Sequence, residues 1–146
     1  MSWQPTPEQR AFVEKYVPFL EDLVADPDKQ WWFRDYMADK MAILLMKERH
    51  TPVANDRWGI GDTIHGEFVR DAYEAGLVPA DYMETIDGAR DADGGMKPLG
   101  QLSDYEVICL IAYFVRGDRF VEDMLLRAVM DGSVLTYMHE LQRRWV

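Results

Sequence analysis

Two arginines and two acidic residues bracket a sharp corner near the C-terminal end of the chain, at Arg116, Asp118, Arg119 and Glu122. A guanidinium group binds the oxygens of phosphate or carboxylate in pairs, and a helix N-terminus adds unpaired backbone N–H groups. A buried arginine also needs carboxylate and carbonyl partners, which this corner could supply from within. We therefore expect either an anion-binding site or a structural clamp here.

Other patterns that could carry chemistry are weak. His65 is a candidate acid–base group that could act beside the arginines. The three histidines, His50, His65 and His139, lack the spacing of zinc ligands, and the chain has one cysteine. The acidic stretch 87–95 does not follow the ligand order of a calcium loop. The sequence therefore predicts no catalytic residue, no metal and no cofactor, and it favours a protein that is not an enzyme.

Acidic residues dominate the middle of the chain. Between Asp62 and Asp93 the sequence has nine acidic residues and only two arginines. Such a segment forms either a solvated face or a surface for a basic partner, including a mimic of nucleic-acid charge aimed at a DNA-binding protein. The net charge of −10 disfavours direct binding to nucleic acid. The residues of this predicted acidic face are Asp62, Glu67, Asp71, Glu74, Asp81, Glu84, Asp87, Asp91 and Asp93.

Length and composition predict one globular domain. The chain has 146 residues, of which 48% are hydrophobic and 12% aromatic, enough for a single core without a disulfide. No apolar run approaches the roughly 18 residues that span a bilayer, and the N-terminus lacks the regions of a signal peptide. We expect a cytoplasmic protein that does not bind membranes. The lone Cys109 is predicted to be a small core residue.

The helices that must position the corner are clearest in the C-terminal part of the chain. Ser103 and Glu106 have the spacing of a capping box, which predicts a helix start. Gly117 is predicted to end that helix in the left-handed conformation, and Asp118 to cap a second helix directly. Ser133 is predicted to cap a third. Three amphipathic helices with such short connections must fold back on one another.

Helical patterns also fill the rest of the chain. Thr6, Pro7 and Gln9 predict the start of the first helix, and Pro18 predicts either a kink or the start of a second one. An aromatic helix around residues 31–45 has a wide apolar surface, which suits a central position in the domain or a homodimer interface.

We therefore predict a compact all-α domain of five to seven helices over residues 1–146. Its predicted parts are N-terminal helices at 6–49, a loop at 50–61, middle helices at 62–87, a loop at 88–102 and a three-helix unit at 103–146. The three-helix unit is expected to pack against the aromatic helix.

The segment Ile111–Glu122, followed by Asp131, Gly132 and Leu135, resembles the C-terminal signature of an uncharacterised family of bacteria and phages, domain of unknown function 6508. The shared pattern is an aliphatic residue, an arginine, two further residues, Arg-Phe and then a glutamate. The resemblance covers about residues 68–144, and the chain departs from it at Asp123, where members tend to carry glycine. It implies a stand-alone α-helical domain and no assigned activity.

The function that we expect is that of a non-enzymatic, protein-binding accessory factor associated with phages or mobile elements. Its acidic face would bind or inhibit a basic, nucleic-acid-binding partner. The alternative is a small-molecule or nucleotide-binding domain with an anion site at Arg116 and Arg119.

Overall fold

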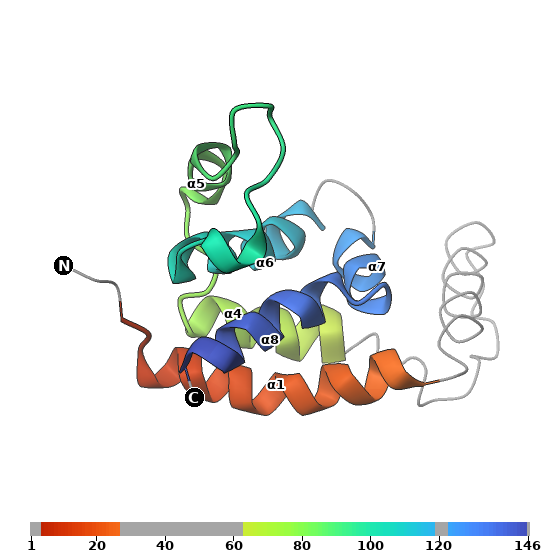
Figure 1. Ribbon diagram of the computed structural model, residues 1–146. Helices are drawn as coiled ribbons and strands as arrows, with labels where there is room; N and C mark the ends of the chain where they lie inside the picture. Colours follow the sequence, from red (N-terminus) through yellow and green to blue (C-terminus); the bar gives the residue numbers. More distant parts are fainter. Residues whose placement is uncertain (1–3, 27–62, 119–122, 146) are drawn as a thin grey trace.

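The computed structural model of the protein describes residues 4–26, 63–118 and 123–145, and the regular structure in these ranges is helical (Figure 1). The one β-type pairing within them is an isolated bridge between Arg90 and Met96. The prediction of an all-α domain is therefore confirmed. In chain order the elements are α1 (Pro7–Ala25), the π-helix η1 (Thr63–Phe68), α4 (Val69–Glu74), α5 (Tyr82–Gly88), the 3₁₀-helix η2 (Leu99–Gln101), α6 (Asp104–Gly117), α7 (Met124–Met130) and α8 (Ser133–Trp145).

The helix α1 begins with the predicted capping box. The Gln9 N–H donates to the Thr6 hydroxyl at 3.1 Å, and the Thr6 N–H donates to the Gln9 side chain at 3.0 Å. Both bonds satisfy backbone donors that the first turn of a helix leaves unpaired. Pro18 lies inside α1 with its ring exposed. Of the two outcomes left open there, the structure excludes a second short helix, because α1 continues to Ala25.

The C-terminal helices fold back on one another and on α1, which runs beneath them in Figure 1. The helix α6 packs against α5, α7 and α8, and α8 packs against α1. Where α1 meets η1, the rings of Phe12, Tyr16 and Phe68 lie with centroids 4.7 to 5.2 Å apart. These rings join the buried aliphatic residues of α6, α7 and α8 in one core.

Two further predictions concern the burial of Cys109 and the packing partner of the three-helix unit. Cys109 is buried, as predicted, and burial raises the pKa of its thiol to about 11. The predicted packing of the three-helix unit against residues 31–45 lies outside the described residues. Among the helices that are described, none has both the length and the apolarity needed to cross a bilayer.

The predicted role of Gly117 is wrong. We expected a left-handed residue that ends the helix, but Gly117 is the last residue of α6 and is not among the residues with positive φ. A Cβ atom at this position would overlap the Sδ atom of Met124, the first residue of α7. The absence of a side chain therefore leaves room for the Met124 side chain against the end of α6.

The second C-terminal helix begins later than predicted. We expected it directly after Asp118, whereas α7 begins at Met124 and is preceded by Asp123 with a φ of 59°. A left-handed residue cannot continue a right-handed helix. The Asp118 carboxylate still acts as a cap, because the Leu125 N–H donates to it at 3.1 Å.

The helix α4 is closed by a left-handed glycine that follows its last turn. Gly76 is left-handed with a φ of 73°, and the Leu77 N–H donates to the Ala72 carbonyl at 2.9 Å. The Gly76 N–H donates to the Tyr73 carbonyl at 3.1 Å. This pattern closes a helix and satisfies carbonyls that its last turn leaves unpaired.

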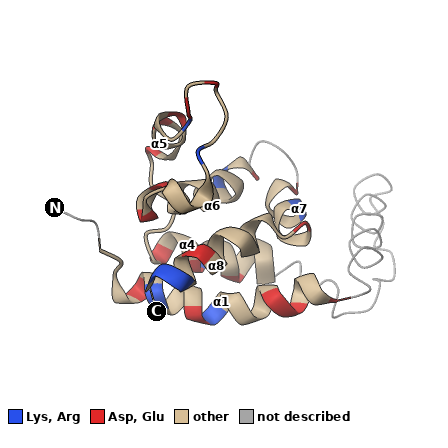
Figure 2. Ribbon diagram, viewed as in Figure 1, with Lys and Arg blue, Asp and Glu red and all other residues tan. Residues whose placement is uncertain are grey.

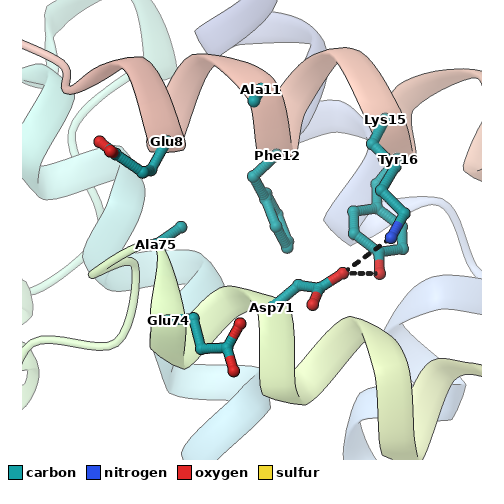
Figure 3. A pocket seen from close by; sticks show the side chains of 8 residues that line it. All are labelled: Glu8, Ala11, Phe12, Lys15, Tyr16, Asp71, Glu74 and Ala75. Atoms are coloured by element: carbon teal, nitrogen blue, oxygen red, sulfur yellow. Dashed lines mark hydrogen bonds and ion pairs between the residues drawn. The ribbon is translucent and has the colours of Figure 1, made fainter.

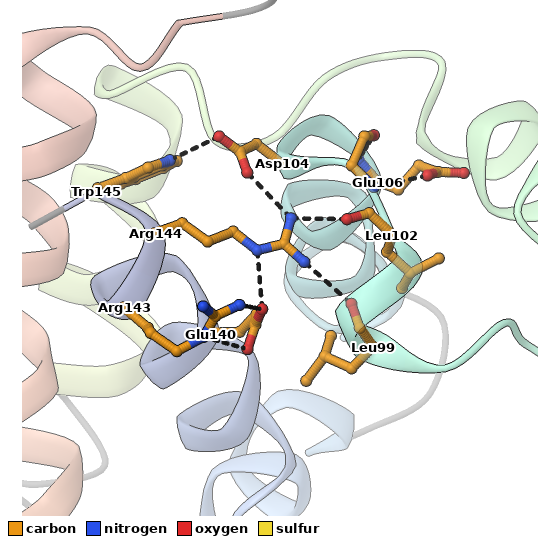
Figure 4. A network of polar contacts seen from close by, with 9 residues as sticks. Leu99, Leu102, Asp104, Glu106, Glu140, Arg143, Arg144 and Trp145 are labelled. Atoms are coloured by element: carbon orange, nitrogen blue, oxygen red, sulfur yellow. Dashed lines mark hydrogen bonds and ion pairs between the residues drawn. The ribbon is translucent and has the colours of Figure 1, made fainter.

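Arg144 joins the end of α8 to the chain that leads into α6 (Figure 4). Its Nη1 donates to the Leu102 carbonyl at 2.7 Å and to the Asp104 carboxylate at 3.0 Å. Its Nη2 donates to the Leu99 carbonyl at 3.0 Å, and its Nε donates to Glu140 at 2.8 Å. The side chain of Arg144 is 14% exposed, so water competes poorly for these bonds.

Replacing Arg144 with methionine keeps an apolar stem and removes the guanidinium group. We expect a loss of about 2–4 kcal/mol in the free energy of unfolding, because buried carbonyls and carboxylates lose their donors. Urea denaturation measures this loss. Arg143→Met is the matched control, since Arg143 also pairs with Glu140 but is 67% exposed, and a much smaller loss is expected. Equal losses in the two variants would contradict the role of Arg144.

Glu140 makes part of the stability depend on pH. Hydrogen bonds from Arg143 and Arg144 lower the pKa of Glu140 from 4.5 to about 2. A carboxylate with a lowered pKa stabilises the fold above its ordinary pKa, and this contribution disappears as the pH falls through the folded-state value.

We therefore expect the difference in unfolding free energy between the wild-type protein and Glu140→Gln to narrow as the pH falls from 4.5 to about 2. Urea denaturation at a series of pH values measures the difference, and the other carboxylates titrate in both proteins. A difference that stays constant over this window would contradict the assignment.

Candidate functional site

A groove with a volume of about 260 Å³ lies between the N-terminal half of α1 and the end of α4 (Figure 3). The residues that α1 contributes recur three and four positions apart, so they share one face of the helix. Ala75, which follows α4 directly, completes the opposite wall. The lining residues are Glu8, Ala11, Phe12, Lys15, Tyr16, Asp71, Glu74 and Ala75.

The floor of the groove is apolar. Phe12 is 4% exposed, and its ring contacts the rings of Tyr16 and Phe68 in the core below. Ala11 lies on one wall and Ala75 on the other. Because an alanine side chain ends at Cβ, these two positions leave room that longer side chains would fill. Short residues on facing helices therefore create the groove.

A hydrogen-bonded network around Asp71 occupies one end of the groove (Figure 3). The Tyr16 hydroxyl donates to Asp71 at 2.6 Å, and the Lys15 Nζ lies 2.9 Å from the same carboxylate and 2.7 Å from Glu67. The bonds from Tyr16 and Lys15 lower the pKa of Asp71. Burial and the bond to Asp71 raise the pKa of Tyr16. Asp71 is therefore an ionised group that contacts two cations, Lys15 and, at 3.4 Å, Arg70.

The other two carboxylates of the groove belong to Glu8 and Glu74. Both side chains are exposed, and neither forms a hydrogen bond or ion pair with any residue that the structure describes. The charged groups of the lining are three carboxylates and one ammonium group, so the lining has a net negative charge. This charge lies toward the end of the groove that carries Glu8, away from Lys15 (Figure 3).

The predicted acidic face is divided between different elements (Figure 2). Asp62 lies outside the described residues. Glu67, Asp71 and Glu74 lie on η1 and α4 and form the first acidic group, which borders the groove. The second acidic group lies on α5, on its N-cap residue and in the loop that follows. Its members are Asp81, Glu84, Asp87, Asp91 and Asp93.

Internal partners offset part of the second acidic group. The Tyr105 hydroxyl donates to Asp81, and this bond raises the pKa of Tyr105 to about 12. The Asp87 carboxylate lies 3.6 Å from the Arg90 guanidinium. Glu84 is exposed and pairs with no described residue.

Asp91 and Asp93 lie in one turn of the loop after α5. The Asp91 N–H donates to the Gly95 carbonyl at 2.8 Å, and the Gly94 N–H donates to the Asp91 carbonyl at 3.1 Å. Hydrogen bonding to Asp91 and to the Gly95 backbone lowers the pKa of Asp93. Asp93 therefore adds a negative charge to the surface of this turn.

The predicted arginine corner is described only in part. Arg119 and Glu122 lie outside the described residues. Arg116 is half-buried, with its guanidinium 6.0 Å from the centroid of the Tyr82 ring. Among the described residues no ion pair joins Arg116 to Asp118, and the Arg116 Nε is buried without a hydrogen-bond partner. The structure therefore does not bring these two residues together.

Asp118 lies beside His65. The His65 Nδ1 lies 3.3 Å from the Asp118 carboxylate, and its Nε2 lies 3.4 Å from Asp123, whose side chain is fully buried. The second contact is too poorly aligned to count as a hydrogen bond. The π-helix that carries His65 is a rare form that often marks functional sites. The structure thus brings the predicted acid–base candidate next to the predicted corner.

The arrangement around His65 does not form a metal site. Each ring nitrogen faces a different carboxylate, so the three side chains do not converge on one point. Across the described ranges, no group of three or more His, Cys, Asp or Glu side chains could hold a metal ion.

Sequence reasoning missed one wall of the groove. Glu8, Ala11 and Lys15 were not among the predicted site residues, although they follow the same helical period as the buried Phe12 and Tyr16. An alanine at the edge of an aromatic stripe, with charged residues one turn away on either side, is the local signal. This pattern indicates a groove only when the helix that packs opposite it is known.

Replacing Asp118 with alanine tests whether its carboxylate caps α7, although Asp118 precedes Leu125 by seven residues. We expect a loss of about 1–2 kcal/mol in unfolding free energy, because the Leu125 N–H loses its acceptor. Asp118→Asn is the matched control, since its amide oxygen can still accept that bond, and a smaller loss is expected. Urea denaturation compares the two, and equal losses would show that the capping bond contributes nothing.

Comparison with known proteins bears on the resemblance of the C-terminal segment. Neither the curated proteins nor the solved structures include a match to this chain. A family model described as "Family of unknown function (DUF6508)" matches residues 45–145, which include every element from η1 to α8 and exclude α1. The match covers more than half of the chain, and the suspected resemblance is confirmed. The chain belongs to the DUF6508 family, whose function is unknown.

Proposed function

We propose that this chain is a non-enzymatic protein-binding factor whose acidic surface binds, and thereby inhibits, a basic nucleic-acid-binding protein. The observation that carries the proposal is a net charge of −10 combined with exposed carboxylates that no described residue neutralises. These carboxylates include those of Glu8, Glu74 and Glu84.

The physical basis is electrostatic competition. A surface that binds nucleic acid carries clustered lysine and arginine side chains. These side chains bind the nucleic acid by neutralising the negative charge of its phosphates. Carboxylates presented on a folded surface satisfy the same side chains and exclude the phosphates. Such a partner would be found in the cytoplasm, where we place the protein.

The alternative function is a small-molecule or nucleotide-binding domain. One observation favours it, which is the half-buried guanidinium of Arg116, whose Nε has no hydrogen-bond partner in the described part of the chain. An unpaired donor at that position could bind an anion.

The test compares the immobilised wild-type chain with the variant Glu8→Gln/Glu74→Gln/Glu84→Gln. We expect the wild-type chain to retain basic nucleic-acid-binding proteins from a cell extract at about 0.1 M salt and to release them at about 0.5 M, because salt screens exposed charges. The variant should retain several-fold less, since none of the three residues has a partner to lose among the residues that the structure describes. Urea denaturation confirms that both chains are equally folded.

A second step tests inhibition. Each retained protein is purified and titrated with labelled DNA or RNA, with and without the wild-type chain. Weaker nucleic-acid binding in the presence of the chain supports the proposal. Retention that is the same for both chains, or that does not depend on salt, would reject it and favour the alternative.

A further inference from the structure

We propose that the groove between α1 and α4 receives one long basic side chain, arginine or lysine, from the protein partner. The inference rests on the proposed function and deepens it, because it assigns one contact of the acidic surface to a defined site. Three features of the groove support it, namely its size, its chemistry and the way in which the molecule already binds a cation beside it.

The size of the groove suits a single side chain. Pockets that bind drug-sized molecules or cofactors have volumes of about 300–1,000 Å³. The groove has a volume of about 260 Å³ and is open to solvent along α1 and α4. It is therefore small for a nucleotide and matches one residue presented by a larger partner.

The chemistry of the lining matches the two parts of a basic side chain. The methylene stem of an arginine or lysine is apolar and packs on apolar surface while its charged head stays hydrated or paired. Ala11, Phe12 and Ala75 supply the apolar surface. Glu8 and Glu74 supply carboxylates that accept charge-assisted hydrogen bonds, and the Phe12 ring adds a cation–π contact.

The neighbouring end of the groove already binds a cation in this way. The Lys15 ammonium lies 5.1 Å from the centroid of the Tyr16 ring and pairs with Glu67 and Asp71. This set consists of one aromatic ring on α1 and two carboxylates beside it.

A similar group of side chains, with one carboxylate on α1 and one on α4, lies one helical turn away. Phe12 precedes Tyr16 by four residues on α1, and Glu74 follows Asp71 by three on α4, so each lies next to its counterpart on the same helix face. Glu8 provides the second carboxylate. The end of the groove near Glu8 therefore presents an aromatic ring and two carboxylates to a cation supplied by another molecule.

The charged residues of the groove also set the orientation of the bound side chain and exclude other ligands. Lys15 repels a basic group from its end of the groove and directs the incoming charge toward Glu8 and Glu74. An acidic side chain would meet three carboxylates. A purely apolar side chain would remove water from Glu8 and Glu74 without replacing their hydrogen bonds.

The experiment uses the full chain labelled with ¹⁵N and three short peptides that are identical except for a central arginine, norleucine or glutamate. We expect the arginine peptide to shift the backbone amide signals of Ala11, Phe12 and Ala75. The norleucine peptide should bind at least about fivefold more weakly, because it lacks the charge, and the glutamate peptide should cause no shift. Equal binding of the arginine and norleucine peptides, or shifts elsewhere in the chain, would overturn the proposal.

Two variants locate the interaction. Glu8→Gln/Glu74→Gln should weaken binding of the arginine peptide about tenfold through the loss of two charged acceptors. The matched control is Glu14→Gln/Asp22→Asn, which removes the same charge from exposed positions outside the groove and should weaken binding less than about twofold. A similar effect of both pairs would show that the net charge, and not the groove, binds the peptide.

Ala11→Leu separates the groove from the wider acidic surface. Ala11 is exposed, so the larger side chain should fill the groove without disturbing the core, and urea denaturation checks the fold. Loss of arginine-peptide binding supports the proposal. If Ala11→Leu retains basic proteins from the extract as well as the wild-type chain while Glu8→Gln/Glu74→Gln/Glu84→Gln does not, the groove proposal fails and the proposed function survives. If neither variant changes retention, the proposed function itself fails.

Discussion

The packing of Phe12 and Tyr16 against Phe68 is the contact on which the candidate site depends. It joins α1 to η1, and so places Tyr16 beside Asp71, although 55 positions separate these two residues in the sequence. Aromatic rings bury large areas and therefore contribute strongly to holding two helices in register. Without this contact the two walls of the groove would have no defined separation, and Ala11 and Ala75 would leave no usable space between them.

The same face of α1 serves both folding and surface charge. Its buried side carries Phe12 and Tyr16, while Lys15 at the edge pairs with Glu67 and Asp71. Lys15 neutralises the part of the first acidic group that lies nearest the aromatic contact. The remaining carboxylates of the groove stay exposed, so the surface combines apolar area with unbalanced charge, as protein-binding sites often do. The buried core and the exposed charge of the groove therefore share one helix, α1.

Two uncommon backbone conformations meet at His65. This residue lies in the π-helix η1, and the carboxylate of the left-handed Asp123 lies beside its imidazole ring. A φ of 59° is a conformation that glycine adopts more readily than other residues. Aspartate is among the few other residues that adopt this conformation readily, and here its buried carboxylate faces the histidine.

The sequence by itself determined the elements whose signals are local. The capping boxes at Thr6 and Ser103 and the glycine stop at Gly76 each depend on residues within about six positions, and all three are present. The all-α class followed from the same local patterns. The prediction for Gly117 failed at a contact between helices, because the side chain of Met124 on α7 occupies the space beside this glycine.

Only the tertiary structure decided which charges remain available. The Arg144 network joins residues more than 40 positions apart. The groove forms between α1 and α4, which are also far apart in the sequence. Periodicity shows which face of a helix is buried, but it does not show which other helix covers that face. The pairing of Glu67 with Lys15, and the absence of such a partner for Glu74 among the described residues, follow from that choice.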